Sequence, residues 1–242
     1  MSGAIAGKST ELVVALDFDT IEAAENIIAA LNGLPVIYKV GLELFTATGS
    51  LWVKHLIASG HRIFLDLKLH DIPNTVAKTI LQIDKMGVEF TTVHLCGGHK
   101  MLDMIADQLP ASSQLKILGV SVLTSFKEEE WISNTSLIAK LGSGRSIHDS
   151  VMHYSTVAHD HPAISGMVCS SLEVEEIRKK YPEQFLMVPG IRLRGANVDD
   201  QARVMTPEEA ASVGASAIVV GRPITQVEDP RDVAEQILND LS

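Results

Sequence analysis

Short apolar runs recur along the chain and alternate with segments in which apolar residues are spaced three or four positions apart. Apolar runs of about four to eight residues predict β-strands. They occupy residues 12–17, 36–41, 62–68, 90–95, 115–123, 164–169, 185–190 and 217–221. The segments between and after them predict amphipathic helices, among them IEAAENIIAALN, VAKTILQIDKMG, EVEEIRKKY and DVAEQILNDL. Strand and helix therefore alternate throughout the chain.

Helix boundary signals support this alternation. Thr206 precedes Pro207 and two glutamates, a pattern typical of a capped helix start. Glycines that favour helix ends follow three predicted helices, at Gly33, Gly60 and Gly87. Only the connection between the fifth and sixth strands is longer, and residues 126–141 and 145–161 both have helical spacing. We therefore expect two helices in that connection.

Eight strand–helix units within 242 residues favour one closed (β/α)₈ TIM barrel over an open, doubly wound sheet. The first strand runs into LDFDT, which lacks the glycine-rich fingerprint of dinucleotide-binding sheets. No proline- or serine-rich linker and no repeat divides the chain. We expect a single domain over residues 1–242, with residues 1–10 as a flexible segment and the active site at the carboxyl ends of the strands.

Composition restricts the classes of partner. The chain is 46% hydrophobic and carries a formal net charge of −10, which disfavours a nucleic-acid-binding role because phosphate neutralisation needs a basic surface. There is neither an apolar signal segment nor a run of about 18 apolar residues, so we expect a cytoplasmic protein without membrane contact. Neither the cysteines, Cys96 and Cys169, nor His70 and His94 have metal-ligand spacing, and no metal site is expected.

Charged residues interrupt the apolar strands near their carboxyl ends. Asp17 ends the first predicted strand, Lys39 lies in the second, and Asp66 and Lys68 lie in the third. The two-residue repeat of a strand puts Asp66 and Lys68 on one face, opposite Leu65, Leu67 and Leu69. Unpaired buried charges are costly, so these residues form either a structural ion-pair network, a solvated strand edge or a reactive site at the barrel mouth. Charges from three strands at one mouth favour the reactive site.

Several motifs carry a family resemblance. LDFD, YKVG, DLKLHDIPNT, VLTS, VPGIR and VVGRPI occur in this order along nearly the whole chain. Together they resemble the orotidine 5′-phosphate decarboxylases in their bacterial form, and DxKxxDIPNT is the most specific of them. The resemblance implies a homodimeric TIM barrel that converts orotidine 5′-monophosphate to UMP, the last step of UMP synthesis. It also implies a carboxy-lyase that needs neither a metal nor an organic cofactor.

The resemblance implies specific roles for residues that match the family's motifs. Its alternating catalytic array corresponds to Lys39, Asp66, Lys68 and Asp71. Asp71 and Thr75 are implied to reach the neighbouring subunit's site. Asp17 is implied to bind a ribose hydroxyl, Lys39 and Asp66 also to contact the substrate, and Thr124 to meet the pyrimidine amide. The implied phosphate-binding residues are Arg192, Gln201, Gly221 and Arg222.

The chemistry of decarboxylation is consistent with these roles. Loss of CO₂ from C6 leaves an electron pair that the ring delocalises poorly, so a fixed nearby cation is needed. The Lys68 ammonium group meets that need and then serves as the proton donor to C6. Asp66 and Asp71, close to Lys68 in sequence, would offset the desolvation of the ammonium group.

Two other functions compete with this one. A Mg²⁺-dependent sugar-phosphate decarboxylase would share the DxKxxD pattern, but Lys39 would repel a divalent cation where that site needs an oxygen ligand. A non-catalytic barrel that binds a phosphorylated ligand would have no use for a buried array of lysines and aspartates, whose desolvation is costly.

Overall fold

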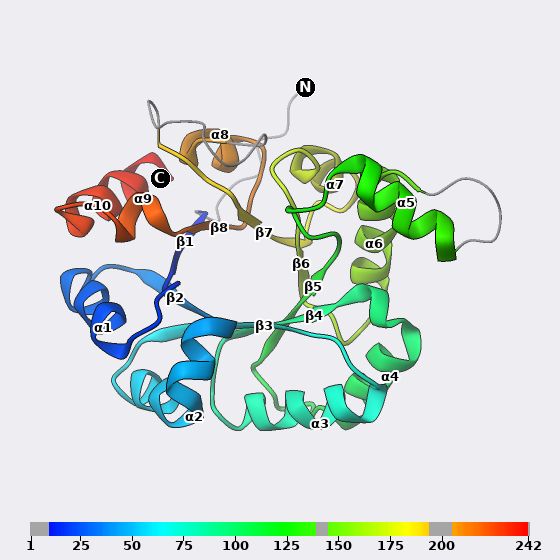
Figure 1. Ribbon diagram of the computed structural model, residues 1–242, viewed down its shortest axis with the longest axis horizontal. Coiled ribbons are helices and arrows are strands. Elements are labelled where there is room, and N and C mark those ends of the chain that lie inside the picture. The colour runs from blue at the N-terminus through cyan, green and yellow to red at the C-terminus, as the bar shows by residue number, and fades with distance from the viewer. Residues whose placement is uncertain (1–9, 139–144, 194–204, 242) are drawn as a thin grey trace.

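The computed structural model describes residues 10–138, 145–193 and 205–241. Within them, eight parallel strands pair in sequence order, and β8 pairs with β1 to close the barrel (Figure 1). The strands are β1 (Glu11–Ala15), β2 (Val36–Gly41), β3 (Arg62–Leu69), β4 (Phe90–His94), β5 (Lys116–Val120), β6 (Gly166–Val168), β7 (Phe185–Pro189) and β8 (Ala217–Val220). The predicted (β/α)₈ barrel is confirmed.

Helices surround this barrel as the spacing of apolar residues predicts (Figure 1). The α-helices are α1 (Ile21–Ala30), α2 (Leu42–Ala58), α3 (Pro73–Asp84), α4 (His99–Gln108), α5 (Glu128–Ile138), α6 (Ile147–Asp160), α7 (Val174–Lys180), α8 (Pro207–Ser212), α9 (Arg222–Thr225) and α10 (Pro230–Asp240). A short 3₁₀ helix, η1 (Leu95–Gly97), follows β4. The predicted cap of α8 is present, because Thr206 and Glu209 each accept a backbone hydrogen bond from the other.

Two strands end at least two residues before the predicted carboxyl end. β1 ends at Ala15, so Asp17 lies beyond the strand, and β5 ends at Val120 although the apolar sequence continues to residue 123. The extra apolar residues fall where the strand no longer pairs with its neighbours. Of the predicted flexible segment 1–10, residues 1–9 lie outside the described residues. Thr10 is buried, and its hydroxyl donates to the Ala215 carbonyl at 2.8 Å.

Two apolar layers hold the barrel together. The outer layer packs the strands against the helices, and alternate strand residues such as Leu12 and Val14 belong to it. The inner layer is built from strand residues alone, namely Val13, Ile37, Phe64, Phe90, Leu118, Met187 and Ala217. This division follows from the alternation of side chains along a strand. The inner layer fills the barrel below the mouth.

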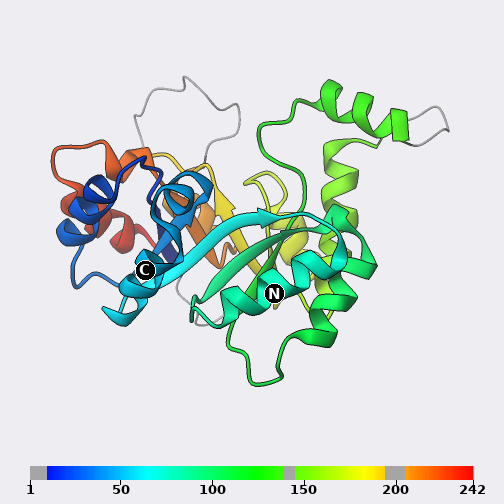
Figure 2. The same cartoon turned by 60° about the horizontal axis from the view of Figure 1, so that its bottom comes forward.

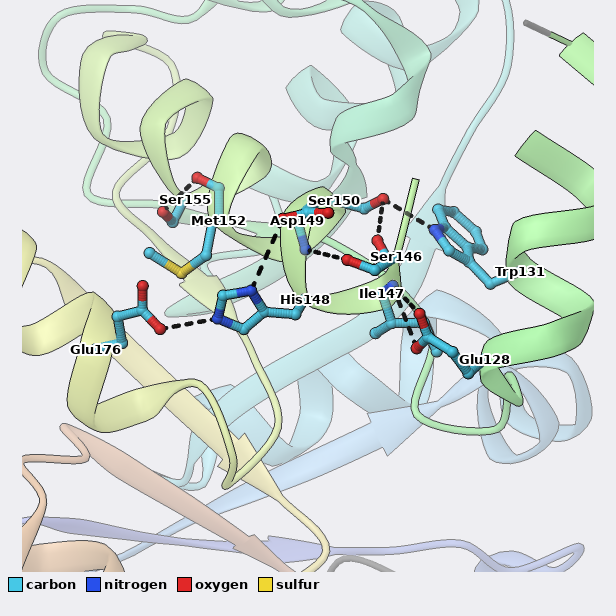
Figure 3. A network of polar contacts seen from close by, with 10 residues as sticks. All are labelled: Glu128, Trp131, Ser146, Ile147, His148, Asp149, Ser150, Met152, Ser155 and Glu176. Atoms are coloured by element: carbon cyan, nitrogen blue, oxygen red, sulfur yellow. Dashed lines mark hydrogen bonds and ion pairs between the residues drawn. The ribbon is translucent and has the colours of Figure 1, made fainter. Parts of the chain in front are cut away.

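The connection between β5 and β6 contains the two helices expected there, and α5 stands away from the barrel (Figure 2). Polar contacts fasten α5 to α6 (Figure 3). The Glu128 carboxylate accepts from the Ile147 backbone N–H at 3.1 Å, at the start of α6. The indole N–H of Trp131 donates to Ser150 Oγ at 2.9 Å. Trp131 also packs against the outer apolar layer, so polar and apolar contacts together hold α5 in position.

Candidate active site at the barrel mouth

The inward-facing positions change from apolar to polar toward the carboxyl ends of the strands. Two residues beyond the inner layer, the same face carries Lys39 on β2, Asp66 on β3 and Thr92 on β4. Asp17 follows β1 at the same end of the barrel. The period of two thus brings side chains from four consecutive strands to one mouth, where TIM barrels carry their active sites.

Three of these side chains, Asp17, Lys39 and Asp66, form a chain of alternating charge with Lys68 of β3. Lys39 Nζ lies 2.8 Å from Asp17 Oδ1 and 4.0 Å from Asp66 Oδ2. Lys68 Nζ lies 2.6 Å from the same Asp66 oxygen. The side chain of Asp66 is 10% exposed and that of Lys68 is 34% exposed. Asp66 therefore sits in a nearly dry position between two ammonium groups, while Lys68 remains open to a ligand at the mouth.

The backbone of Lys68 departs from a regular strand. Its φ of 48° is left-handed, and it is the only non-glycine residue with positive φ in the described part of the chain. That conformation costs an L-residue roughly 1–2 kcal/mol. The pairing of β3 with β4 also shifts register between Leu65 and Leu69. Strain of this kind is concentrated at functional sites, which makes Lys68 a functional candidate on conformational grounds alone.

The predicted separation of side chains along β3 is confirmed despite this irregularity. Asp66 and Lys68 meet each other at the mouth, as the prediction required. Leu65 is buried in the outer apolar layer, and Leu67 and Leu69 pack against that layer. The strand therefore keeps its alternation on both sides of the register shift.

Asp71 and Thr75 follow this chain of charges in the sequence, Asp71 just before α3 and Thr75 in the first turn of that helix. Both residues are exposed, and Asp71 forms no ion pair within the described part of the chain. Its carboxylate accepts a hydrogen bond from the backbone N–H of Ile72 at 2.6 Å. Ile72, between them in the sequence, is 66% exposed. Within the described part of the chain, Asp71 is joined to the four charged residues neither by an ion pair nor by a side-chain hydrogen bond.

The remaining predicted residues follow β5, β7 and β8. Thr124 is exposed in a turn after β5. The backbone N–H of Arg192 donates to the Met205 carbonyl at 3.1 Å, and Arg222 opens α9. Gln201 lies outside the described residues. A Cβ atom built on Gly221 would lie 3.9 Å from Asp17 Oδ2, so the turn after β8 adjoins the mouth beside Asp17.

His94 ends β4 close to the charged chain. It is half-buried, and its ring centroid lies 5.6 Å from that of His70. Burial lowers the pKa of His94, and the positive charges of His70 and Lys68 lower it further, against the opposite effect of Asp66. His94 is therefore held toward its neutral form beside the array. No cluster of three or more His, Cys, Asp or Glu suited to a metal ion occurs within residues 10–138, 145–193 and 205–241.

The sequence analysis did not select Thr92, although a signal for it exists. Along FTTVH, the two-residue repeat puts Phe90, Thr92 and His94 on one face. That face changes from apolar to polar toward the mouth, as it does on β2 and β3. Reading β4 by the same alternation would have added Thr92 to the candidates.

The chain was compared with known proteins. A family model described as "Orotidine 5'-phosphate decarboxylase / HUMPS family" matches residues 10–237. An orotidine 5′-phosphate decarboxylase of Listeria monocytogenes serovar 1/2a is 42% identical over 94% of this chain and 97% of its own length. One from Legionella pneumophila strain Corby is 40% identical, covering 96% and 99%. The crystal structure of the Lactobacillus acidophilus orotidine 5′-phosphate decarboxylase has a TM-score of 0.81 at 34% identity, covering 96% and 99%.

Proposed function

Because this chain belongs to the orotidine 5′-phosphate decarboxylase / HUMPS family, we propose that it decarboxylates orotidine 5′-monophosphate to UMP and CO₂, the final step of pyrimidine nucleotide synthesis. The observation that carries the proposal is the chain Asp17–Lys39–Asp66–Lys68 at the barrel mouth. It presents a hydrogen-bonded ammonium group next to a nearly dry carboxylate. A reaction that develops negative charge on carbon requires a cation held in place before the reaction begins.

Lys68 is the proposed catalytic residue. The bond between C6 and the substrate carboxylate breaks, CO₂ leaves, and the electron pair stays on C6. The Lys68 ammonium group stabilises that pair and then transfers one proton from Nζ to C6, which yields UMP. The 2.6 Å contact with Asp66 supports this role, because it holds the ammonium group in one position and so limits reorganisation during the reaction.

The other predicted residues bind the rest of the substrate. Asp17 and Lys39 bind the ribose, and Thr124 binds the pyrimidine amide. The phosphate-binding residues are Arg192, Gln201, Gly221 and Arg222. The proximity of Gly221 to Asp17 supports this arrangement, because ribose and phosphate are adjacent in a nucleotide. Loops after the seventh and eighth strands commonly bind phosphate in this fold.

We also propose a homodimer with shared active sites. Asp71, Ile72 and Thr75 are all exposed, and Asp71 forms no ion pair with the charged chain of its own subunit within the described residues. A symmetric pair would bury Ile72 and bring Asp71 of each chain to the other's site. We further propose that residues 1–242 form one domain, that the enzyme is cytoplasmic and that it needs no cofactor. No helix in the described ranges is long and apolar enough to cross a bilayer.

Lys39 weighs against a Mg²⁺-dependent sugar-phosphate decarboxylase. Its ammonium group lies between the carboxylates of Asp17 and Asp66, where it occupies the oxygen ligands that a divalent cation would require. The remaining alternative is a ligand-binding protein, namely a barrel that binds a phosphorylated ligand without catalysing a reaction. The array of lysines and aspartates favours an enzyme, because a barrel that only binds its ligand would bear the desolvation cost of the array without using its charges.

A spectrophotometric assay tests the proposal. The protein is mixed with orotidine 5′-monophosphate in excess EDTA, and the loss of substrate absorbance is followed. We expect turnover that is equal with EDTA and with added Mg²⁺. Absence of turnover in both conditions would overturn the proposed reaction. Turnover that EDTA abolishes would instead show that the reaction depends on a metal ion.

A further inference from the structure

Thr92 is a polar side chain at the centre of the barrel. It is 0% exposed, on the inward face of β4. Its hydroxyl donates to Asp66 Oδ1 at 2.8 Å and accepts from the backbone N–H of Lys68 at 2.8 Å. Buried hydroxyl groups are normally satisfied in this way, but here both partners belong to the charged array. A single hydroxyl thus contacts the carboxylate of one array member and the backbone of another.

The first of these bonds assigns the two oxygens of Asp66 to different partners. A hydroxyl has one hydrogen, and Thr92 donates it to Oδ1. Oδ2 is then the oxygen that faces Lys68 Nζ at 2.6 Å and Lys39 Nζ at 4.0 Å. Without the Thr92 bond, the carboxylate is free to rotate about its terminal bond, because that torsion is broad in aspartate. Thr92 therefore determines the orientation of the carboxylate between the two ammonium groups.

The second bond acts on the irregular part of β3. Register between β3 and β4 shifts from Leu65 to Leu69, and the Lys68 N–H lies inside that interval. Thr92 Oγ1 supplies its acceptor in place of a regular ladder carbonyl. The bond thereby supports the left-handed φ of 48° at Lys68. The direction in which the Lys68 side chain leaves the backbone depends on that conformation.

We infer that Thr92 is a positioning residue for the decarboxylation, which orients the Asp66 carboxylate and holds the Lys68 backbone so that the ammonium group is fixed at the mouth. This inference rests on the proposed function. Thr92 acts through Asp66 and Lys68 and makes no contact with the reacting atoms. Its removal should therefore lower kcat far more than it weakens substrate binding.

The neighbouring threonine provides a matched control. Thr91 is also 0% exposed on β4, and its hydroxyl donates to the Leu65 carbonyl at 2.9 Å. It differs from Thr92 in facing the opposite side of the strand, away from the charged array. Thr91→Val and Thr92→Val remove the same group from equally buried positions. The difference between the two variants isolates what the hydroxyl does for the array.

The experiment measures kcat, KM for orotidine 5′-monophosphate and Tm for wild type, Thr91→Val, Thr92→Val and Thr92→Ser. Loss of a hydrogen bond to a charged group predicts a kcat reduced by about 10- to 100-fold in Thr92→Val. KM should change by less than about threefold, because the variant retains every proposed substrate contact. Thr92→Ser keeps the hydroxyl and should retain most of the wild-type kcat. Thr91→Val should keep kcat within about twofold even where its Tm falls.

Equal kcat in wild type and Thr92→Val, or equal losses in Thr91→Val and Thr92→Val, would overturn the inference. If Thr92→Val does not fold, Thr92→Cys replaces it, because a thiol has similar size and is only a weak donor.

Crystal structures of wild type and Thr92→Val test the positioning role without turnover, so the result stands apart from that of the proposed reaction. We expect the contact between Lys68 Nζ and Asp66 Oδ2 to be lost or the carboxylate to be rotated. An unchanged array in the variant would overturn the inference even if the wild type decarboxylates the nucleotide.

Discussion

The barrel carries a charged network at each end, and the two networks have different geometry. At the base, where the strands begin, Arg62 contacts Glu11 at 2.7 Å and both oxygens of Glu89, at 2.7 and 2.8 Å. Lys116 contacts Glu89 at 3.0 Å. The guanidinium group binds the Glu89 carboxylate with two parallel hydrogen bonds, and the Lys116 ammonium group also lies 4.8 Å from the centroid of the Phe90 ring. The base network is therefore built around a bidentate pair.

The network at the mouth is open. It ends in Asp17, whose side chain is 63% exposed, and in Lys68, whose ammonium group contacts a single carboxylate in this structure. Each of these end groups therefore keeps hydrogen-bonding capacity for a ligand. Because both ends of the barrel carry ion pairs, ion pairing alone does not identify a functional site. A network built around a bidentate pair at the strand starts indicates stability, whereas a chain of single contacts at the barrel mouth indicates binding or catalysis.

Ionisation at the base agrees with a structural role. Burial raises the pKa of Glu89, but hydrogen bonds from Arg62 and Lys116 lower it by more, so the net pKa lies below the ordinary value of 4.5. The hydrogen bond with Glu89 raises the pKa of Arg62. The central pair of the base network, Arg62 and Glu89, therefore stays charged through the neutral range.

The largest effect is expected from removing one ammonium group at each end. Lys68→Ala removes the cation and the proton donor, and should lower kcat by about 10⁴-fold or more. Lys116→Ala removes an ammonium group that also contacts one carboxylate, and should leave kcat within about twofold. Circular dichroism and UMP binding verify folding. A near-wild-type kcat in Lys68→Ala would reject the proposed role of the mouth network.

The second effect concerns the phosphate, which lies far from the bond that breaks. If phosphate binding helps to complete the mouth, the nucleoside orotidine should react more slowly than its 5′-phosphate even at saturation. Arg222→Ala should lower kcat/KM for the nucleotide by about 10²-fold and barely affect the nucleoside. Arg231→Ala is the control, because Arg231 contacts the Asn32 carbonyl on the outer surface. Equal damage to both substrates by Arg222→Ala would show a structural role for that arginine.

The third prediction tests whether the mouth network of one subunit includes Asp71 of the other subunit in a dimer. Lys68→Ala and Asp71→Ala subunits, each inactive alone, are mixed in equal amounts and allowed to exchange. Half of the dimers are then mixed, and one of their two sites has both native groups, so about a quarter of wild-type activity should return. Verified exchange without recovered activity would show that Asp71 does not act in the partner's site.

The smallest effect is expected at the base. Glu89→Gln should leave kcat unchanged and lower the free energy of unfolding by about 1–2 kcal/mol, because charge-assisted bonds become neutral ones. Since folding lowers the pKa of Glu89, its stabilisation is full above pH 4.5 and is lost as the pH falls through the folded value. The Tm difference between wild type and variant should therefore narrow below pH 4.5. A difference that stays constant with pH would contradict the assignment.

The fold class and most of the candidate array could be predicted from local sequence. Period-two alternation in RIFLDLK puts Asp66 and Lys68 on one face, and the recurrence of strand and helix predicts the barrel that brings Lys39 beside them. Strand ends were less accurate, as β5 shows, because apolar residues continue past the last paired position. Asp71, Thr75 and Gln201 remain predictions that rest on the family resemblance.

By itself, therefore, the sequence determined the alternation of elements and the identity of the charged residues, because side-chain periodicity is a local property of the chain. Only the tertiary structure decided which charges meet. It joined Glu11, Arg62 and Glu89 at the base, although each alone has the pattern of a solvated strand start. It also shifted the register of β3 at Lys68 and set the Thr92 hydroxyl against it. These pairings depend on how neighbouring strands align across the barrel, and that alignment is set by long-range packing.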